Sequence, residues 1–126
     1  MTSPSKPRQT AALAQTAAAI CVDSKANDVV LLDLDKVSDM TDFFVIASGT
    51  SDTHVRSIAE HVMEEMRRRG LSAHHVEGLN QGRWVLIDFV DFVVHVFHPT
   101  LRTFYQLERL WGDAAVVQVV PQGAVT

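Results

Sequence analysis

Cysteine is nearly absent from this sequence, because Cys21 is the single cysteine among 126 residues. An intramolecular disulfide, a cysteine zinc site and a CxxC redox motif are therefore excluded. A chain without disulfides suits a reducing compartment such as the cytosol, so we expect a cytoplasmic protein. The six histidines do not replace the missing thiols, since their spacings bring no set of them together on one ion. We therefore expect neither a metal nor another cofactor.

Basic residues are also scarce. The chain has 11 Lys and Arg against 15 Asp and Glu, which gives a net charge of −4 with neutral histidines. Nonspecific binding to nucleic acid needs clustered basic side chains that neutralise phosphates. Here the basic residues are spread out, apart from the triplet Arg67, Arg68 and Arg69. We expect no direct sequence-specific nucleic-acid contact, and an acidic domain is better suited to a basic protein partner.

Long apolar runs are missing as well. No run reaches the ~18 residues that a transmembrane helix needs, so no membrane partner is expected. The alanine-rich start resembles a signal peptide only faintly, since Gln15 and Thr16 interrupt its apolar part. With 47% apolar and 21% charged residues, the composition is typical of one globular domain.

Hydrophobic periodicity predicts an α+β domain with the element order α-β-β-α-β-β-β-α. The predicted helices cover residues 9–25, 51–70 and 100–112, and the predicted strands cover 28–36, 42–49, 71–78 and two parts of 83–97. We expect a disordered tail at residues 1–8, a single domain at 9–113 and a C-terminal tail at 114–126. That last stretch could be a strand-like arm or a frayed end.

The connections predict the sheet type. The strand at 42–49, the helix at 51–70 and the strand at 71–78 form one crossover, which should be right-handed and leave its two strands parallel. The other links are short and favour antiparallel pairing. We therefore expect a mixed sheet of about five strands with packed helices. The helix at 51–70 has the clearest apolar stripe, made of Val55, Ile58, Ala59, Val62, Met63 and Met66.

The most apolar long run is WVLIDFVDFVVHVFHP, residues 84–99. As one strand it would be roughly two to three times the usual length, so we expect a hairpin with a two-residue turn at Phe89-Val90. This register pairs Trp84 with His95 and Asp88 with Asp91. Because side chains alternate between faces, one face is purely apolar and carries Val85, Ile87, Phe92, Val94 and Val96. The mixed face carries Trp84, Leu86, Asp88, Asp91, Val93 and His95.

The mixed face allows several interpretations. A Trp with aliphatic neighbours and a polar rim is typical of a partner-binding surface. A helix that simply covers this face, with both aspartates at a solvated hairpin end, predicts the same pattern. The opposed carboxylates of Asp88 and Asp91 could also form an acid/base pair or bind magnesium.

A second acidic pair supports the alternative function, a small magnesium-dependent nucleotidyltransferase-like enzyme. Asp33 and Asp35 alternate on a predicted strand and so share a face, as the metal-binding pairs of nucleotidyl transferases do. In that family a Gly-Ser turn precedes the acidic pair. Here Ser48-Gly49 follows the pair, which is the wrong order for this chemistry.

Three segments carry a resemblance to a known family: TDFFVIASGTSDTHVRSIAEHV, EGLNQGRWVLIDFVDFVVHVFHP and RTFYQLERLWGD. In order and spacing they are similar to the ribosomal silencing factor family, RsfS or Iojap, over about residues 10–113. The resemblance implies a mixed α/β domain like a nucleotidyl-transferase core without its activity, and hence a protein that is not an enzyme.

The resemblance also implies a function and a partner. Such proteins repress translation by binding the large ribosomal subunit through its fourteenth large-subunit protein, which blocks joining with the small subunit when nutrients run short. They also have a role in large-subunit maturation and often form homodimers. The start MTSPSKPRQT has little of an organelle presequence, which favours a bacterial cytosolic member.

The family's partner-binding positions are carried over here by motif to Trp84, Leu86, Asp88, Arg102 and Tyr105. The first three also belong to the mixed face that strand alternation identifies. Together with Asp91, Val93 and His95 they form the predicted partner-binding set. Val90 is a departure from the family, because many relatives have Gly in this hairpin.

Overall fold

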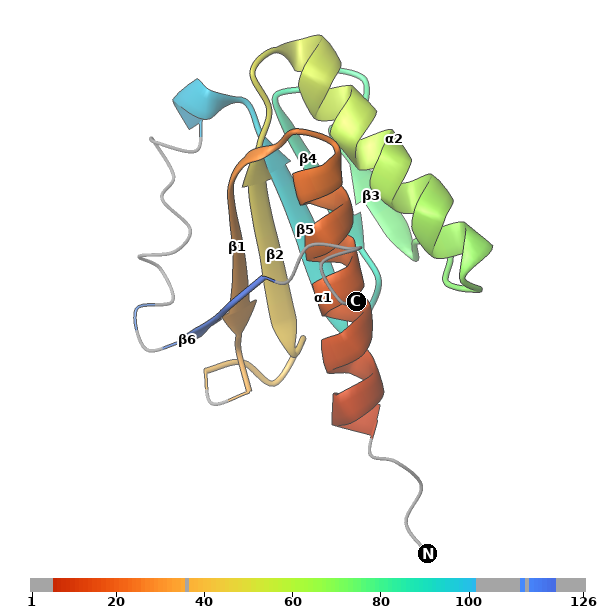
Figure 1. Cartoon of the computed structure of the whole chain (residues 1–126), viewed down its shortest axis with the longest axis vertical. Coiled ribbons are helices and arrows are strands. Elements are labelled where there is room, and N and C mark those ends of the chain that lie inside the picture. Colours follow the sequence, from red (N-terminus) through yellow and green to blue (C-terminus); the bar gives the residue numbers. More distant parts are fainter. Residues whose placement is uncertain (1–5, 36, 102–111, 113, 120–126) are drawn as a thin grey trace, which may run out of the picture.

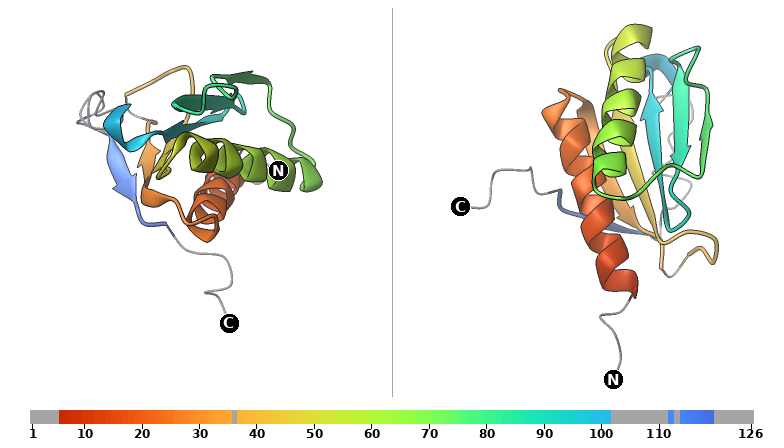
Figure 2. Two further views of the ribbon diagram at one scale, coloured as in Figure 1. Left: turned by 90° about the horizontal axis from the view of Figure 1, so that it is seen from above. Right: turned by 90° about the vertical axis from the view of Figure 1, so that its right-hand side faces the viewer.

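The structure, a computed structural model, describes residues 6–35, 37–101, 112 and 114–119. Its elements in chain order are α1 (Lys6–Asp23), β1 (Asn27–Asp33), β2 (Phe43–Ser48), α2 (Asp52–Arg68), β3 (His75–Glu77), β4 (Trp84–Asp88), β5 (Phe92–Phe97) and β6 (Ala115–Val117). The strands form one sheet, and both helices pack on the same face of it (Figure 1; Figure 2, left). The predicted α+β class is confirmed.

The sheet has the strand order β3-β4-β5-β2-β1-β6. The pair β2–β5 is parallel and the other four pairs are antiparallel, so the sheet is mixed as predicted. The crossover through α2 leaves β2 and β3 parallel but not adjacent, because β4 and β5 insert between them. Within the described residues there are six strands rather than about five, since β6 from the C-terminal stretch pairs with β1 at one edge.

The helices begin and end where local sequence allows. Helix α1 starts three residues earlier than predicted, because Pro7 fits the first turn of a helix, where its missing N–H has no helical acceptor to lose. Helix α2 starts after Ser51, whose hydroxyl accepts a hydrogen bond from the His54 backbone N–H at 3.1 Å. It ends at Arg68, and two residues later Gly70, with a φ of +89°, continues the chain in the left-handed region.

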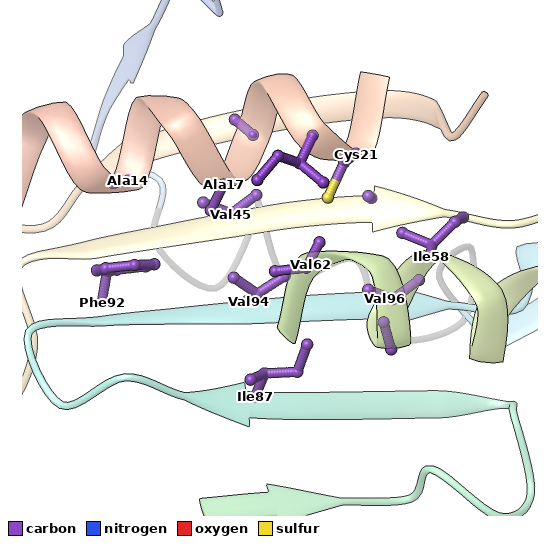
Figure 3. Packing of buried hydrophobic residues seen from close by; sticks show 14 of the residues in the cluster. Ala14, Ala17, Cys21, Val45, Ile58, Val62, Ile87, Phe92, Val94 and Val96 are labelled. Atoms are coloured by element: carbon purple, nitrogen blue, oxygen red, sulfur yellow. The ribbon is translucent and has the colours of Figure 1, made fainter. Parts of the chain in front are cut away.

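The main core lies between helices α1 and α2 on one side and the sheet on the other (Figure 3). Helix α1 supplies small side chains such as Ala14, Ala17 and Cys21, which allow close approach to β2. Helix α2 supplies the predicted stripe, of which Val55, Ile58, Ala59, Val62 and Met66 are fully buried. The sheet contributes the apolar face of the hairpin, including Ile87, Phe92, Val94 and Val96.

Some expectations fall on residues outside the described part of the chain. The predicted helix at 100–112 lies almost wholly there, as do residues 1–5 of the predicted tail. The division of the chain at residue 113 stays a prediction. Within the described residues, no helix has the length and apolar character needed to cross a bilayer.

Candidate functional site

The candidate site is built on the β4–β5 hairpin, and its register differs from the predicted one. Leu86 lies opposite His95, and Trp84 lies opposite Phe97. The prediction paired Trp84 with His95 and is wrong by two residues. The loop is formed by Val90 and Asp91. Phe89 still pairs with the other strand, because its N–H donates to the Phe92 carbonyl at 2.9 Å. Its ring is buried and stacks on Phe92 at a centroid distance of 4.9 Å, which extends the paired strands by one residue each.

The turn itself is unusually tight. Val90 has a φ of +75°, a conformation that a β-branched residue rarely adopts. The Asp91 N–H donates to the Phe89 carbonyl two residues earlier at 2.9 Å, and this spacing defines a γ-turn. The Asp88 carboxylate accepts a hydrogen bond from the Val90 N–H at 2.7 Å and supports the turn from the strand end. Asp88 therefore has a structural contact in addition to any functional one.

A register error of two residues leaves every strand side chain on its predicted face, because strand alternation has a period of two. Val85, Ile87, Phe92, Val94 and Val96 are buried under the helices, as predicted. Asp91 is the exception on the other face. It belongs to the loop, is half-buried, and its carbonyl accepts a hydrogen bond from the Asp42 N–H at 2.8 Å. Asp88 and Asp91 are therefore not an opposed cross-strand pair.

The face of the sheet away from the helices has a closed part and an open part. The closed part is a second apolar cluster of four buried side chains from β1, β2, β5 and the residue after β1: Leu32, Leu34, Ile46 and Phe97. Leu101 and Ala114 pack against this cluster. The open part lies toward the hairpin tip, where Leu86, Asp88 and Val93 are only half-buried. Trp84 is also half-buried, but it lies at the other end of β4, opposite Phe97, and packs against the second cluster.

A groove of about 440 Å³ opens on the mixed face. Its floor and walls come from β2, β4, β5, the hairpin tip, the segment before β3 and the loop between β1 and β2: Ser38, Met40, Thr41, Phe44, His74, Leu86, Asp88, Val90 and Val93. Met40 is 91% exposed and Val90 is 53% exposed, so two large apolar side chains flank the groove in contact with solvent. Exposed apolar side chains beside a groove with one carboxylate are typical of a protein-binding surface.

Six lining residues were not in the predicted set, and the loop before β2 supplies three of them: Ser38, Met40 and Thr41. Sequence alone offered little signal for them, since a loop carries no strand alternation. Met40 is the one apolar residue in the segment SDMTD, and a single apolar residue in a loop is too common to predict a binding site.

His95 is part of the predicted set, yet it lies beneath the surface with only 4% exposure. Its Nδ1 accepts a hydrogen bond from the Trp84 indole N–H at 3.1 Å. Burial among apolar groups lowers the pKa of His95 to about 4, because desolvation disfavours the charged imidazolium. His95 is therefore neutral at physiological pH and contacts Trp84 rather than solvent.

Two further predicted site residues, Arg102 and Tyr105, lie outside the described residues. Asp33 and Asp35, the acidic pair of the alternative enzyme, lie within the described residues, and their predicted arrangement on one strand is wrong. Strand β1 ends at Asp33, so Asp35 is not on the strand. The Asp33 carboxylate instead accepts a hydrogen bond from the Asp35 backbone N–H at 2.9 Å, which is a local turn contact.

The single cysteine does not line this groove. Cys21 is buried in the main core, and burial raises the pKa of its thiol to about 12, so the thiol is protonated and unreactive at neutral pH. In the described ranges no three His, Cys, Asp or Glu side chains are grouped so that they could hold a metal ion.

Comparison with known proteins gives a family for this fold and surface. The family described as "Ribosomal silencing factor during starvation", RsfS, matches residues 7–125. The chain belongs to the RsfS family. The "Ribosomal silencing factor RsfS" of Bacillus subtilis is 42% identical over 103 residues, which are 82% of this chain and 87% of that protein.

Two other similarities extend the RsfS comparison. A crystal structure of a protein from Bacillus halodurans has 39% sequence identity and a TM-score of 0.72, and the match covers 88% of this chain and 98% of that one. The mouse protein "Mitochondrial assembly of ribosomal large subunit protein 1" is 30% identical over 68% of this chain and 39% of its own length. Relatives are thus named as regulatory or assembly factors of the ribosome.

Proposed function

We propose that this RsfS-family protein represses translation by binding the large ribosomal subunit through its fourteenth large-subunit protein and sterically blocking joining with the small subunit. The repression operates in the bacterial cytosol when nutrients are limiting, and the protein also has a role in large-subunit biogenesis. Such a mechanism requires no chemical turnover. It requires only a protein-binding surface whose occupied position overlaps the place of the small subunit.

The observation that carries the proposal is the half-buried Trp84 on the mixed face. Indole side chains dominate protein interfaces because they bury a large apolar area and keep one hydrogen-bond donor. Leu86 and Val93 extend the apolar area beside it, and Asp88 adds a charge at the rim. The family resemblance implies partner-binding residues at Trp84, Leu86 and Asp88, which are the same strand positions.

Charge supports the same type of partner. The protein has a net charge of −4, and the carboxylate of Asp88 lines the groove. A basic ribosomal protein would be attracted to this surface, and complementary charge mainly speeds the encounter of two proteins. A lysine or arginine of the partner could lay its aliphatic stem on Leu86 and Val93 and extend its charged end toward Asp88.

The decisive experiment is sedimentation of the Trp84→Ala protein with purified large subunits on sucrose gradients. We expect its affinity to fall by at least about 30-fold, since truncation of an interface hot spot costs 2 kcal/mol or more. The same variant should fail to prevent subunit joining when it is added before the small subunit. Circular dichroism should remain native, because Trp84 lies outside the main core. Wild-type affinity in a folded Trp84→Ala protein would reject the proposed surface.

A second leucine, Leu79, offers a matched control for a substitution of Leu86. Leu86 and Leu79 are both half-buried, but Leu79 lines a separate groove beside α2 together with Met63 and Arg67. Leu86→Ala should weaken binding to the large subunit by about tenfold, whereas Leu79→Ala should leave it unchanged. Equal losses in both variants would mean that general destabilisation, and not the mixed face, explains the effect.

We further propose that the protein is a homodimer, as the family resemblance implies. Light scattering behind a sizing column measures the mass in solution directly. A monomer of 13.9 kDa at micromolar concentration would contradict this part of the proposal without affecting the proposed ribosome contact.

A further inference from the structure

A buried histidine lies directly beneath the proposed anchor of the interface. His95 occupies the middle of β5 and is 4% exposed. Three aromatic rings surround its imidazole, with centroid distances of 4.6 Å to Phe44, 6.0 Å to Trp84 and 6.1 Å to Phe97. Trp84 also stacks on Phe97 at 5.1 Å. The imidazole of His95 and the ring of Phe97 therefore both contact the indole of Trp84.

The hydrogen bond between the two side chains determines the tautomer of His95. An indole N–H can only donate, so Nδ1 of His95 must carry no proton. The neutral imidazole then has its proton on Nε2. In the described part of the structure, this Nε2 is buried and has no hydrogen-bond partner.

A buried N–H group without an acceptor destabilises the folded protein. An apolar residue of similar volume at position 95 would avoid this penalty and would still pack against Phe44 and Phe97. Stability of the fold therefore does not explain a histidine here. A leucine could reproduce neither the ring contacts with Phe44 and Phe97 nor the hydrogen bond to Trp84, and only the hydrogen bond orients the indole.

We propose that His95 is a positioning residue of the docking surface, whose unprotonated Nδ1 holds the Trp84 indole in the orientation that the ribosomal partner meets. This inference rests on the proposed function, because it assigns Trp84 to the interface. A fixed rotamer increases affinity, because less side-chain freedom is lost when the partner binds. His95 itself does not need to touch the partner, in agreement with its burial.

The surroundings keep His95 in the required state. Its direct cross-strand neighbours are Leu86 on β4 and Ile46 on β2, both apolar. The elements packed against it therefore present rings and aliphatic groups, which do not stabilise an imidazolium. Burial keeps the pKa of His95 near 4, so Nδ1 stays available as an acceptor throughout the physiological range.

The test compares variants that keep, remove or move the acceptor. In His95→Asn the amide oxygen can occupy nearly the same place as Nδ1, in His95→Leu no acceptor remains, and in His95→Gln the amide lies further out along the side chain. The first readout is the indole N–H resonance of Trp84 in the free, full-length protein, assigned by its loss in Trp84→Phe. Its exchange with solvent should accelerate by about tenfold or more in His95→Leu and His95→Gln, and should stay near the wild-type rate in His95→Asn.

The second readout is affinity for purified large subunits. We expect His95→Leu to bind about tenfold more weakly and His95→Asn to restore most of this loss. In the Trp84→Phe background the His95→Leu change should have no further effect, because there is no indole left to position. If His95→Leu fails to fold, the comparison of His95→Asn with His95→Gln still tests the position of the acceptor.

The proposal is overturned if His95→Leu binds as the wild type does, or if its loss is equally large in the Trp84→Phe background. An unchanged indole exchange rate in His95→Leu would overturn it as well. Failure of the proposed function is recognised separately. In that case Trp84→Ala would bind large subunits normally, while the indole resonance would still report whether His95 holds Trp84 in the free protein.

Discussion

The two faces of the β4–β5 hairpin use the same strands in different ways. On the face under the helices, Val85, Ile87, Val94 and Val96 have no exposed surface at all. On the opposite face, Trp84 and Leu86 remain half-buried, although each is directly adjacent in sequence to one of the fully buried residues, and Leu86 lines the groove. Strand alternation thus separates residues that stabilise the fold from residues available to a partner.

The largest expected effect is on the free energy of unfolding, and it compares two adjacent residues that lie on opposite faces of β4. Ile87→Ala should lower the free energy of unfolding by roughly 3–4 kcal/mol, since it leaves a cavity in a closed core. Leu86→Ala should lower it by only about 1 kcal/mol, because its site is open to solvent. Urea denaturation measures both values. Equal destabilisation by the two variants would show that the faces do not differ in this way.

The second prediction concerns the pH dependence of stability, which should depend on His95, the buried polar residue of the mixed face. The pKa of His95 is about 4 in the folded protein, below the ordinary value of 6.5, because burial disfavours the cation. Between pH 6.5 and about 4 the unfolded chain binds a proton that the folded chain does not, so stability falls as the pH falls through this window.

The size of that loss follows from the pKa difference. Lowering the pH from 7 to 4.5 should remove roughly 2–3 kcal/mol of unfolding free energy on account of His95. His95→Asn lacks this titration and should lose correspondingly less over the same range, as urea titrations at both pH values can measure. Identical losses in the two proteins would mean that His95 is not held neutral by burial.

The smallest expected effect separates the two contacts of Asp88. Asp88→Asn keeps an oxygen that can accept the Val90 N–H but removes the charge, whereas Asp88→Ala removes both. We expect unfolding free energies near wild type for Asn and lower by about 1 kcal/mol for Ala. Large-subunit association should become slower and less salt-sensitive in both. Stopped-flow binding at two salt concentrations tests this, and an unchanged salt dependence would exclude Asp88 from the electrostatic contact.

Much of the fold could be predicted from local patterns. The stripe from Val55 to Met66 identified both the helix α2 and its buried side, because helical spacing of apolar residues is a property of the sequence. The hairpin was also expected, but its register was wrong by two residues. Turn preferences already disfavoured Phe89-Val90 as the loop, but they did not fix another register. The stacking of Phe89 on Phe92 in the core does.

The candidate site was predictable only in part, for a related reason. Trp84, Leu86 and Val93 could be assigned to one face by counting residues along an extended chain. Met40 and Thr41 could not be added to them, because their loop lies against this face only after β2 has paired with β5. Asp35 was placed wrongly since β1 ends earlier than its apolar pattern suggested.

The sequence by itself determined which hairpin residues share a face, because alternation depends only on neighbours along the chain and survives a register shift of two. The tertiary structure alone decided how deep each of them lies and what it touches. His95 and Trp84 lie on the same face of the hairpin, yet His95 is buried and Trp84 is only half-buried, since burial depends on the strands and loops that surround each position. On this one face the indole of Trp84 therefore lies at the surface, and the imidazole of His95 lies beneath it.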